Sequence, residues 1–144
     1  MKKTLLTTIT LLMLATVPIQ SMAWGKSFNQ GYFLSMDSFD DLVMKGDNLK
    51  LNNFILAEED AWSSKNLNNL KFSCSARNRG NKSRHFSIMI VGLNSENEIL
   101  WAMNAEPSMY VLSSNSIETI STEVYVLDGM LRQTAQIWIK VALD

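Results

Sequence analysis

Residues 70–77 alternate strictly between apolar and polar side chains. The apolar positions are Leu70, Phe72, Cys74 and Ala76, and the polar positions are Lys71, Ser73, Ser75 and Arg77. A period of two places the two sets on opposite faces of an extended chain. The pattern therefore predicts a strand with one buried face, and we place it at the centre of the fold.

Neighbouring segments show related patterns. Residues 49–58 predict an earlier strand. Residues 85–93 are apolar on both faces, which is typical of a central strand covered on both sides. The turn-rich residues 78–83 connect the strand at residues 70–77 to the strand at residues 85–93, and they predict a hairpin of these two strands. Residues 99–104 predict the next strand, with Trp101 in the core because it alternates with apolar neighbours.

Two long strands are expected at the C-terminal end, over residues 120–126 and 135–143. If they pair directly, Trp138 lies beside Glu123 or Tyr125 on the solvent side, because the apolar faces must coincide. An aromatic side chain on that face indicates a candidate contact surface. The alternative is that the indole covers a sheet edge or the N-terminal segment.

The first 23 residues show the pattern of an export signal and not of a strand. Lys2 and Lys3 precede an apolar run, and small residues at positions 21 and 23 fit a cleavage site, so residues 1–23 are interpreted as a bacterial secretory signal peptide. The apolar run is shorter than the roughly 20 residues that span a bilayer. Residues 24–47 are expected to be a partly loose N-terminal segment. Within it, residues 38–45 fit a short helix or the start of a first strand.

Six to eight strands with near-regular spacing predict an all-β fold, an antiparallel β-sandwich over residues 48–144. The turn Asn78-Arg79-Gly80, the line IVGLNSENEIL and the Ser/Asn loop before the last two strands resemble the FxLYD type of immunoglobulin-like domain in bacterial envelope proteins. The likeness covers about residues 68–144. It departs from the family pattern at Asn94, which replaces an aspartate, and at Asn97-Glu98, which replaces a glycine. The resemblance implies an immunoglobulin-like fold and no shared catalytic residues.

Charge and cysteine content limit the classes of function that the chain can have. Without Lys2 and Lys3 the chain keeps 11 basic and 14 acidic residues, a net charge of −3, which argues against nucleic-acid binding. The single cysteine, Cys74, excludes an internal disulfide, and its place among apolar positions predicts a buried, unreactive thiol.

Candidate chemistry is sparse. The chain has one histidine, His85, no nucleophile elbow and no metal-binding spacing of Cys and His. The acidic residues Asp37, Asp40, Asp41 and Asp47 do not follow the series of a calcium-binding loop. Carboxylate-pair hydrolysis needs only two acids, but the acids gather in loops. We therefore expect a protein that is not an enzyme and needs no cofactor or metal.

Two binding functions are expected instead. The first is a periplasmic or secreted adaptor that binds another envelope or secreted protein through the surface of Trp138, Tyr125 and Glu123. The second is an inhibitor or immunity protein, with residues 58–69 or 113–116 as its inhibitory loop. Trp62 stands alone in a hydrophilic segment and is interpreted as a lid on the core or a contact residue. Carbohydrate binding would need coplanar exposed tryptophans.

Overall fold

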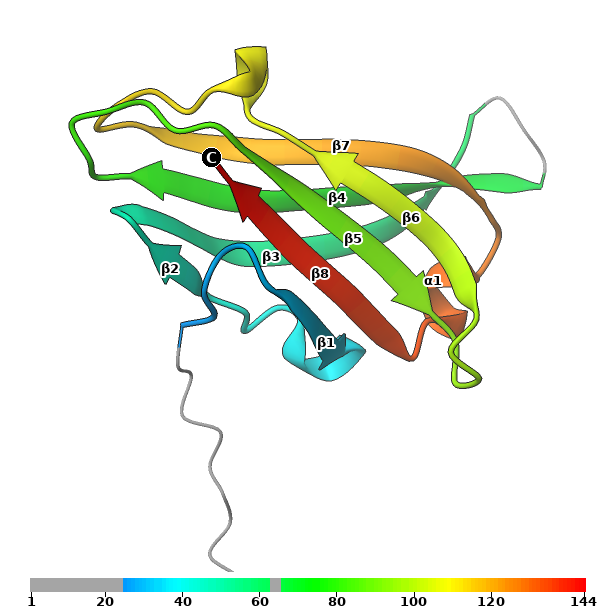
Figure 1. The fold of residues 1–144 in the computed structure, drawn as a ribbon. Helices are drawn as coiled ribbons and strands as arrows, with labels where there is room; N and C mark the ends of the chain where they lie inside the picture. The colour runs from blue at the N-terminus through cyan, green and yellow to red at the C-terminus, as the bar shows by residue number, and fades with distance from the viewer. Residues whose placement is uncertain (1–24, 63–65) are drawn as a thin grey trace, which may run out of the picture.

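The computed structural model describes residues 25–62 and 66–144, which form two four-stranded antiparallel sheets packed face to face (Figure 1). One sheet has the order β1-β8-β5-β6 and the other the order β2-β3-β4-β7. The strands are β1 (Gly31–Ser35), β2 (Met44–Gly46), β3 (Leu49–Asp60), β4 (Leu67–Asn78), β5 (Phe86–Leu93), β6 (Ile99–Ala105), β7 (Ile117–Leu127) and β8 (Gln136–Leu143). The predicted all-β sandwich is confirmed.

The strand order is of the immunoglobulin type. β3-β4-β7 in one sheet face β6-β5-β8 in the other, and these correspond to strands A-B-E and C′-C-F of such a sandwich. β1 pairs antiparallel with β8, so it occupies the position of strand G. A strand from the N-terminal part of the chain thus completes a sheet that would otherwise end at β8.

The N-terminal segment, expected to be partly loose, is part of the sandwich. β1 pairs with β8 over five residue pairs from Gly31↔Lys140 to Ser35↔Gln136, and β2 pairs with β3. Of the two alternatives for residues 38–45, the short helix is absent, and the chain leads into the strand β2 instead. A 3-10 turn, η1 (Met36–Ser38), precedes β2. Phe39, Leu42 and Met44 enter the core one after another from non-helical chain, and this burial outweighs the helix signals.

Apolar residues from both sheets fill the space between them. Phe39, Phe54 and Phe72 form an aromatic cluster with ring centroids 5.7 to 6.5 Å apart. The inward faces of β4 and β8 are those that the alternation predicts, because Leu70, Phe72, Cys74, Ala76, Ile137, Ile139 and Val141 are all buried. The periodicity of these strands thus identified their buried faces correctly.

The predicted hairpin of β4 and β5 is wrong, since these strands belong to different sheets. The side chain of Asn78 fixes the crossover. Its amide donates hydrogen bonds to the carbonyl oxygens of Lys82 (2.8 Å) and Ser113 (3.0 Å), and its oxygen accepts one from the Gly80 amide (2.9 Å). Because Asn78 is buried, these bonds compensate for its lost hydration. The Asn-x-Gly segment therefore turns the chain from one sheet to the other.

β7 and β8 do not pair either, and a single helical turn, α1 (Met130–Gln133), connects them across the sandwich. Glu58 of β3 accepts hydrogen bonds from the backbone amides of Gly129 (2.6 Å) and Leu131 (2.8 Å) and from the Asn68 side chain (2.8 Å). Partial burial alone would raise the pKa of Glu58, but these bonds and the charge of Arg132 outweigh it and lower the pKa. Glu58 thus anchors the β7–β8 connection.

The predicted signal peptide, residues 1–23, lies outside the described residues. Within residues 25–62 and 66–144, no helix is both long and apolar enough to cross a membrane.

Candidate functional site

The outer face of the β1-β8-β5-β6 sheet carries a row of apolar residues that crosses all four strands. Phe33 of β1, Trp138 of β8, Val91 of β5 and Ala102 of β6 are partners in register. Phe33 is 66% exposed, Trp138 and Val91 are half-buried, and Met89 in the next row is also exposed. β5 was expected to be covered on both faces, but its outer face is open to solvent.

Trp138 lies over Gly31 of the neighbouring strand. A Cβ atom built at Gly31 would be only 2.6 Å from the indole Nε1 of Trp138. The absence of a side chain at position 31 therefore leaves room for the indole against β1, where part of its surface is buried. Trp138 faces outward, as the alternation predicts, and it also covers the N-terminal strand.

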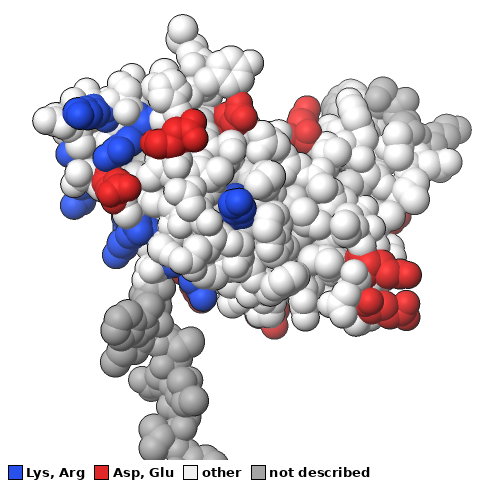
Figure 2. Space-filling model, viewed as in Figure 1, with Lys and Arg blue, Asp and Glu red and all other residues white. Residues whose placement is uncertain are grey.

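The same sheet is almost free of charge. Lys140 is the one charged residue in β1, β5, β6 and β8 together. The strands of the other sheet contain nine, which are Lys45, Lys50, Glu58, Glu59, Asp60, Lys71, Arg77, Glu118 and Glu123. Figure 2 shows the front of the molecule as a broad white surface with an isolated blue group near its middle. Depletion of charge with exposed aromatic and Met side chains is typical of the centre of a protein interface.

Glu123 and Tyr125 lie on the opposite outer face, so the expected surface that would combine them with Trp138 does not exist. β7 pairs with β4, which brings Glu123 opposite Lys71 and Tyr125 opposite Asn69. Trp138 instead belongs to the sheet of β1, β5 and β6. β7 and β8 both alternate between apolar and polar residues, which suggested that they pair. Strands with this alternation can equally well lie in opposite sheets and face each other across the core.

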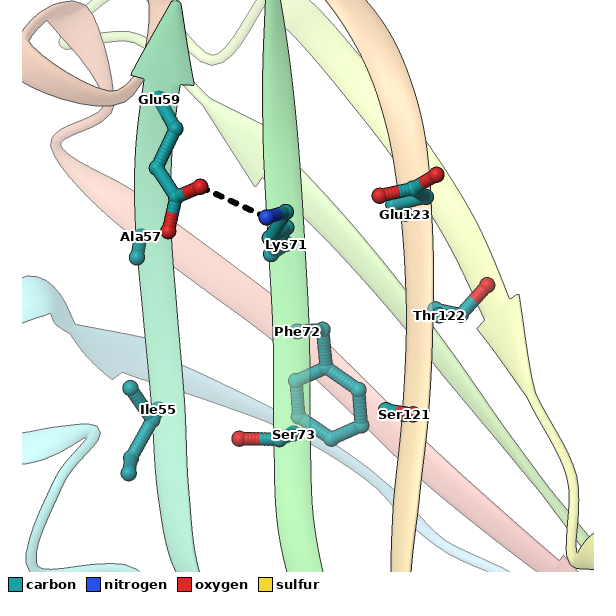
Figure 3. Close-up of a pocket in the computed structure, with 9 residues that line it drawn as sticks. All are labelled: Ile55, Ala57, Glu59, Lys71, Phe72, Ser73, Ser121, Thr122 and Glu123. Carbon is teal, nitrogen blue, oxygen red and sulfur yellow. Dashed lines mark hydrogen bonds and ion pairs between the residues drawn. The ribbon is translucent and has the colours of Figure 1, made fainter.

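A shallow depression of about 480 Å³ lies on that opposite face (Figure 3). Small side chains at Ala57, Ser73 and Ser121 form its floor, and Lys71 and Glu123 rise beside them. Lys71 Nζ is 2.6 Å from Glu59 Oε2, and this hydrogen bond and the carboxylate charge raise the pKa of Lys71. The side chains are exposed, so the pair contributes little to stability.

The remaining predicted residues lie apart from both faces. Trp62 is fully exposed at the β3–β4 connection, so it is not a lid on the core. Trp101 is buried, as expected, and its indole nitrogen donates a hydrogen bond to Thr134 Oγ1 (2.9 Å). The tryptophans Trp62, Trp101 and Trp138 therefore form no common platform for a sugar.

The groups with potential for catalysis are separated. Cys74 is buried, and burial raises the pKa of its thiol to about 12, so the reactive thiolate is absent near neutral pH. His85 interacts through its ring Nδ1 with the backbone oxygen of Tyr110, 3.1 Å away. Within the described parts of the chain, no three His, Cys, Asp or Glu residues gather as metal ligands.

One exposed feature was missed from the sequence. After β6 a 3-10 turn, η2 (Ser108–Tyr110), projects from the sandwich with Met109 and Tyr110 exposed. No glycine or asparagine in residues 107–111 signals such a turn.

Comparison with known proteins gave no match to a family model, a curated protein or a solved structure. The resemblance to FxLYD-type domains therefore stays a prediction.

Proposed function

We propose that this chain is a non-enzymatic, exported bacterial protein that binds another envelope or secreted protein through the outer face of the β1-β8-β5-β6 sheet. The observation that carries the proposal is the uncharged apolar row of Phe33, Trp138, Val91 and Ala102 on an outer sheet face, in which Phe33 and Ala102 are exposed and Trp138 and Val91 are half-buried. An aromatic anchor on an uncharged surface loses little hydration energy when a partner covers it.

The position of the Trp138 indole further supports the proposal. Trp138 is held against Gly31, so it loses little side-chain freedom on binding, and a pre-organised aromatic side chain is typical of binding hot spots. Lys140, on the same face, can orient the partner through one charge. In this account the protein acts as an adaptor subunit, and its outer sheet face is the contact surface.

An inhibitor or immunity protein is the second candidate, because the projecting turn of Met109 and Tyr110 has the form of a loop that enters a cleft. The loops named for this function fit it less well. Of residues 58–69, Glu58 and Asp60 belong to β3 and Asn69 belongs to β4, and residues 63–65 lie outside the described residues. The turn at residues 113–116 is tied to Asn78 and Gly80 by hydrogen bonds.

Photo-crosslinking from two exposed aromatic positions tests the proposal. p-Benzoylphenylalanine replaces Phe33 on the proposed face and, as a matched control, Tyr125 on the opposite face, in the full chain expressed in its own host. We expect one protein to crosslink strongly from position 33 and weakly from position 125. Recovery of an envelope-assembly subunit supports the adaptor function, whereas an enzyme whose activity is abolished supports inhibition. Equal crosslinking from both positions, or none from position 33, would contradict the proposed face.

A further inference from the structure

The segment after β6, residues 107–111, projects from the sandwich as a short loop (Figure 1). Its two largest side chains lie in solvent, with Met109 88% and Tyr110 74% exposed. Met and Tyr are side chains that protein interfaces favour over the rest of the surface. The loop therefore places two interface-type residues at the most exposed point of this end of the molecule.

The backbone of this loop is unusual. Met109 (φ 56°) and Tyr110 (φ 64°) are both in the left-handed region, which is unfavourable for side chains other than Gly, Asn or Asp. The other six non-glycine residues with positive φ in the described chain are Asn29, Asp47, Asn48, Asn53, Asn97 and Asn115. Met109 and Tyr110 are thus the two positions where this conformation opposes residue preference, and such strain is typical of functional sites.

Contacts at its base hold the loop in this conformation. The Ser108 amide donates a hydrogen bond to Glu118 Oε1 (2.6 Å), and the Tyr110 amide donates one to the Pro107 oxygen (2.9 Å). The Tyr110 oxygen lies 3.1 Å from the ring Nδ1 of His85. Because the backbone is fixed in advance, the loop loses little conformational entropy when a partner binds it.

Three carboxylates lie close to the loop. Glu106 precedes it, Glu118 binds its backbone, and Asp144 shares a depression of about 220 Å³ with Tyr110. Neither ion pair found in the described chain involves these three carboxylates, and the nearby Arg84 donates to the Asp47 oxygen instead (2.8 Å). Figure 2 shows acidic groups at the base of the projecting loop, which itself carries no charge.

The loop is continuous with the proposed contact face. The depression beside Tyr110 is also lined by Ser87 of β5 and Ala142 of β8, which face outward on the same sheet. A standard interface buries about 800 Å² of accessible surface per partner. The raised loop at the end of this face enlarges the surface that one partner can cover.

We propose that Met109 and Tyr110 insert together into an apolar pocket with a basic rim on the partner protein. This inference rests on the proposed protein-binding function and specifies the chemistry of the partner. The apolar tip requires an apolar pocket, and the three carboxylates around it match basic side chains at the rim. A bilayer fits less well, because its anionic headgroups would repel the acidic base of the loop.

Crosslinking from the loop tests the inference. p-Benzoylphenylalanine at Tyr110 should crosslink to the same protein as at Phe33, and not to lipid or to a second copy of the chain. The full chain should also fail to sediment with vesicles of zwitterionic or of mixed anionic phospholipid. A protein that crosslinks from position 33 but not from position 110 would contradict the loop inference and leave the proposed face standing. Crosslinking from position 110 but not from position 33 would contradict the proposed face and leave the loop inference standing.

Affinity for the purified, identified partner provides the second measurement. Met109→Ser and Tyr110→Ser should each weaken binding by about 30-fold, which corresponds to a hot-spot contribution of about 2 kcal/mol. Ile117→Ser is the matched control, since Ile117 is an exposed apolar residue outside the loop. Raising salt from 50 to 300 mM should weaken the wild-type complex, because it screens the acidic base from the basic rim. An unchanged dissociation constant in both loop variants would overturn the inference.

Discussion

The indole of Trp138 lies on Gly31, a residue 107 positions earlier in the chain whose missing side chain makes room for it. The contact joins the first strand to the last and forms the centre of the proposed contact surface. It links the stability of β1 to the position of the aromatic anchor.

Gly31→Ala should therefore lower the stability of β1 and displace the Trp138 indole. The new methyl group would overlap the indole, and overpacking of this kind costs about 1–3 kcal/mol of unfolding free energy. Denaturant unfolding measures the loss. Gly25→Ala is the matched control, because a Cβ there meets only the Lys45 side chain at 3.4 Å. Equal stability of the two variants would show that Trp138 does not lie on β1.

A second glycine and tryptophan pair is buried, and there the effect should be larger. Gly92 faces Trp101 across β5 and β6, and a Cβ at position 92 would overlap the buried indole, which the hydrogen bond to Thr134 holds in place. We expect Gly92→Ala to lower the melting temperature more than Gly31→Ala does. Thr134→Val, which leaves the indole nitrogen unpaired, should cost about 1–3 kcal/mol. A stable Gly92→Ala variant would contradict this packing.

Protonation of Glu58 should destabilise the fold at low pH. The folded state lowers the pKa of Glu58, so its carboxylate stabilises the protein above the unfolded-state value of 4.5, and this contribution is lost as the pH falls through the folded-state pKa. Glu58→Gln should therefore be less stable than wild type at pH 7, by about 1 kcal/mol, as for loss of a helix cap. The difference should shrink as the pH falls below 4.5 and through the lowered folded-state pKa. A difference independent of pH would show that the charge has no role.

The Cys74 thiol should be unreactive in the native protein. Its pKa of about 12 leaves almost no thiolate at pH 8, and its burial excludes bulky reagents. A disulfide reagent such as 5,5′-dithiobis(2-nitrobenzoic acid) should react only at the rate of unfolding. Cys74→Ser should lower stability and leave partner binding unchanged. Rapid labelling of the folded chain, or a disulfide-linked dimer on non-reducing gels, would contradict a buried thiol.

Alternation of apolar and polar residues predicted the buried faces of β4, β7 and β8, because a period of two directly reports which side chains share a face. It could not predict which strands pair. Leu70 and Ile88 fit the core equally well whether their strands are neighbours or lie in opposite sheets. The crossover depends on the buried side chain of Asn78, whose partners Lys82 and Ser113 are close only in the fold.

The candidate site was partly predictable for the same reason. Trp138 was placed on the outer face of β8 by its position between Ile137 and Ile139. Its neighbours Phe33 and Val91 come from other strands, and a pairing of β7 with β8 wrongly suggested Tyr125 instead. The exposed turn at Met109 was not predictable, because tertiary contacts impose its left-handed backbone.

The most direct measurement for the proposed contact face is the dissociation constant of the identified partner for wild type, Trp138→Ala and Tyr125→Ala. Both variants remove an aromatic side chain from an outer sheet face, but only Trp138 lies on the face whose strands carry a single charged residue, Lys140. Trp138 is half-buried, so its truncation should cost less than the roughly 3–5 kcal/mol of a core aromatic, and thermal unfolding verifies that the variants fold. We expect Trp138→Ala to weaken binding by about 30-fold or more and Tyr125→Ala by less than about twofold. Full affinity in folded Trp138→Ala, or a larger loss in Tyr125→Ala, would contradict the account.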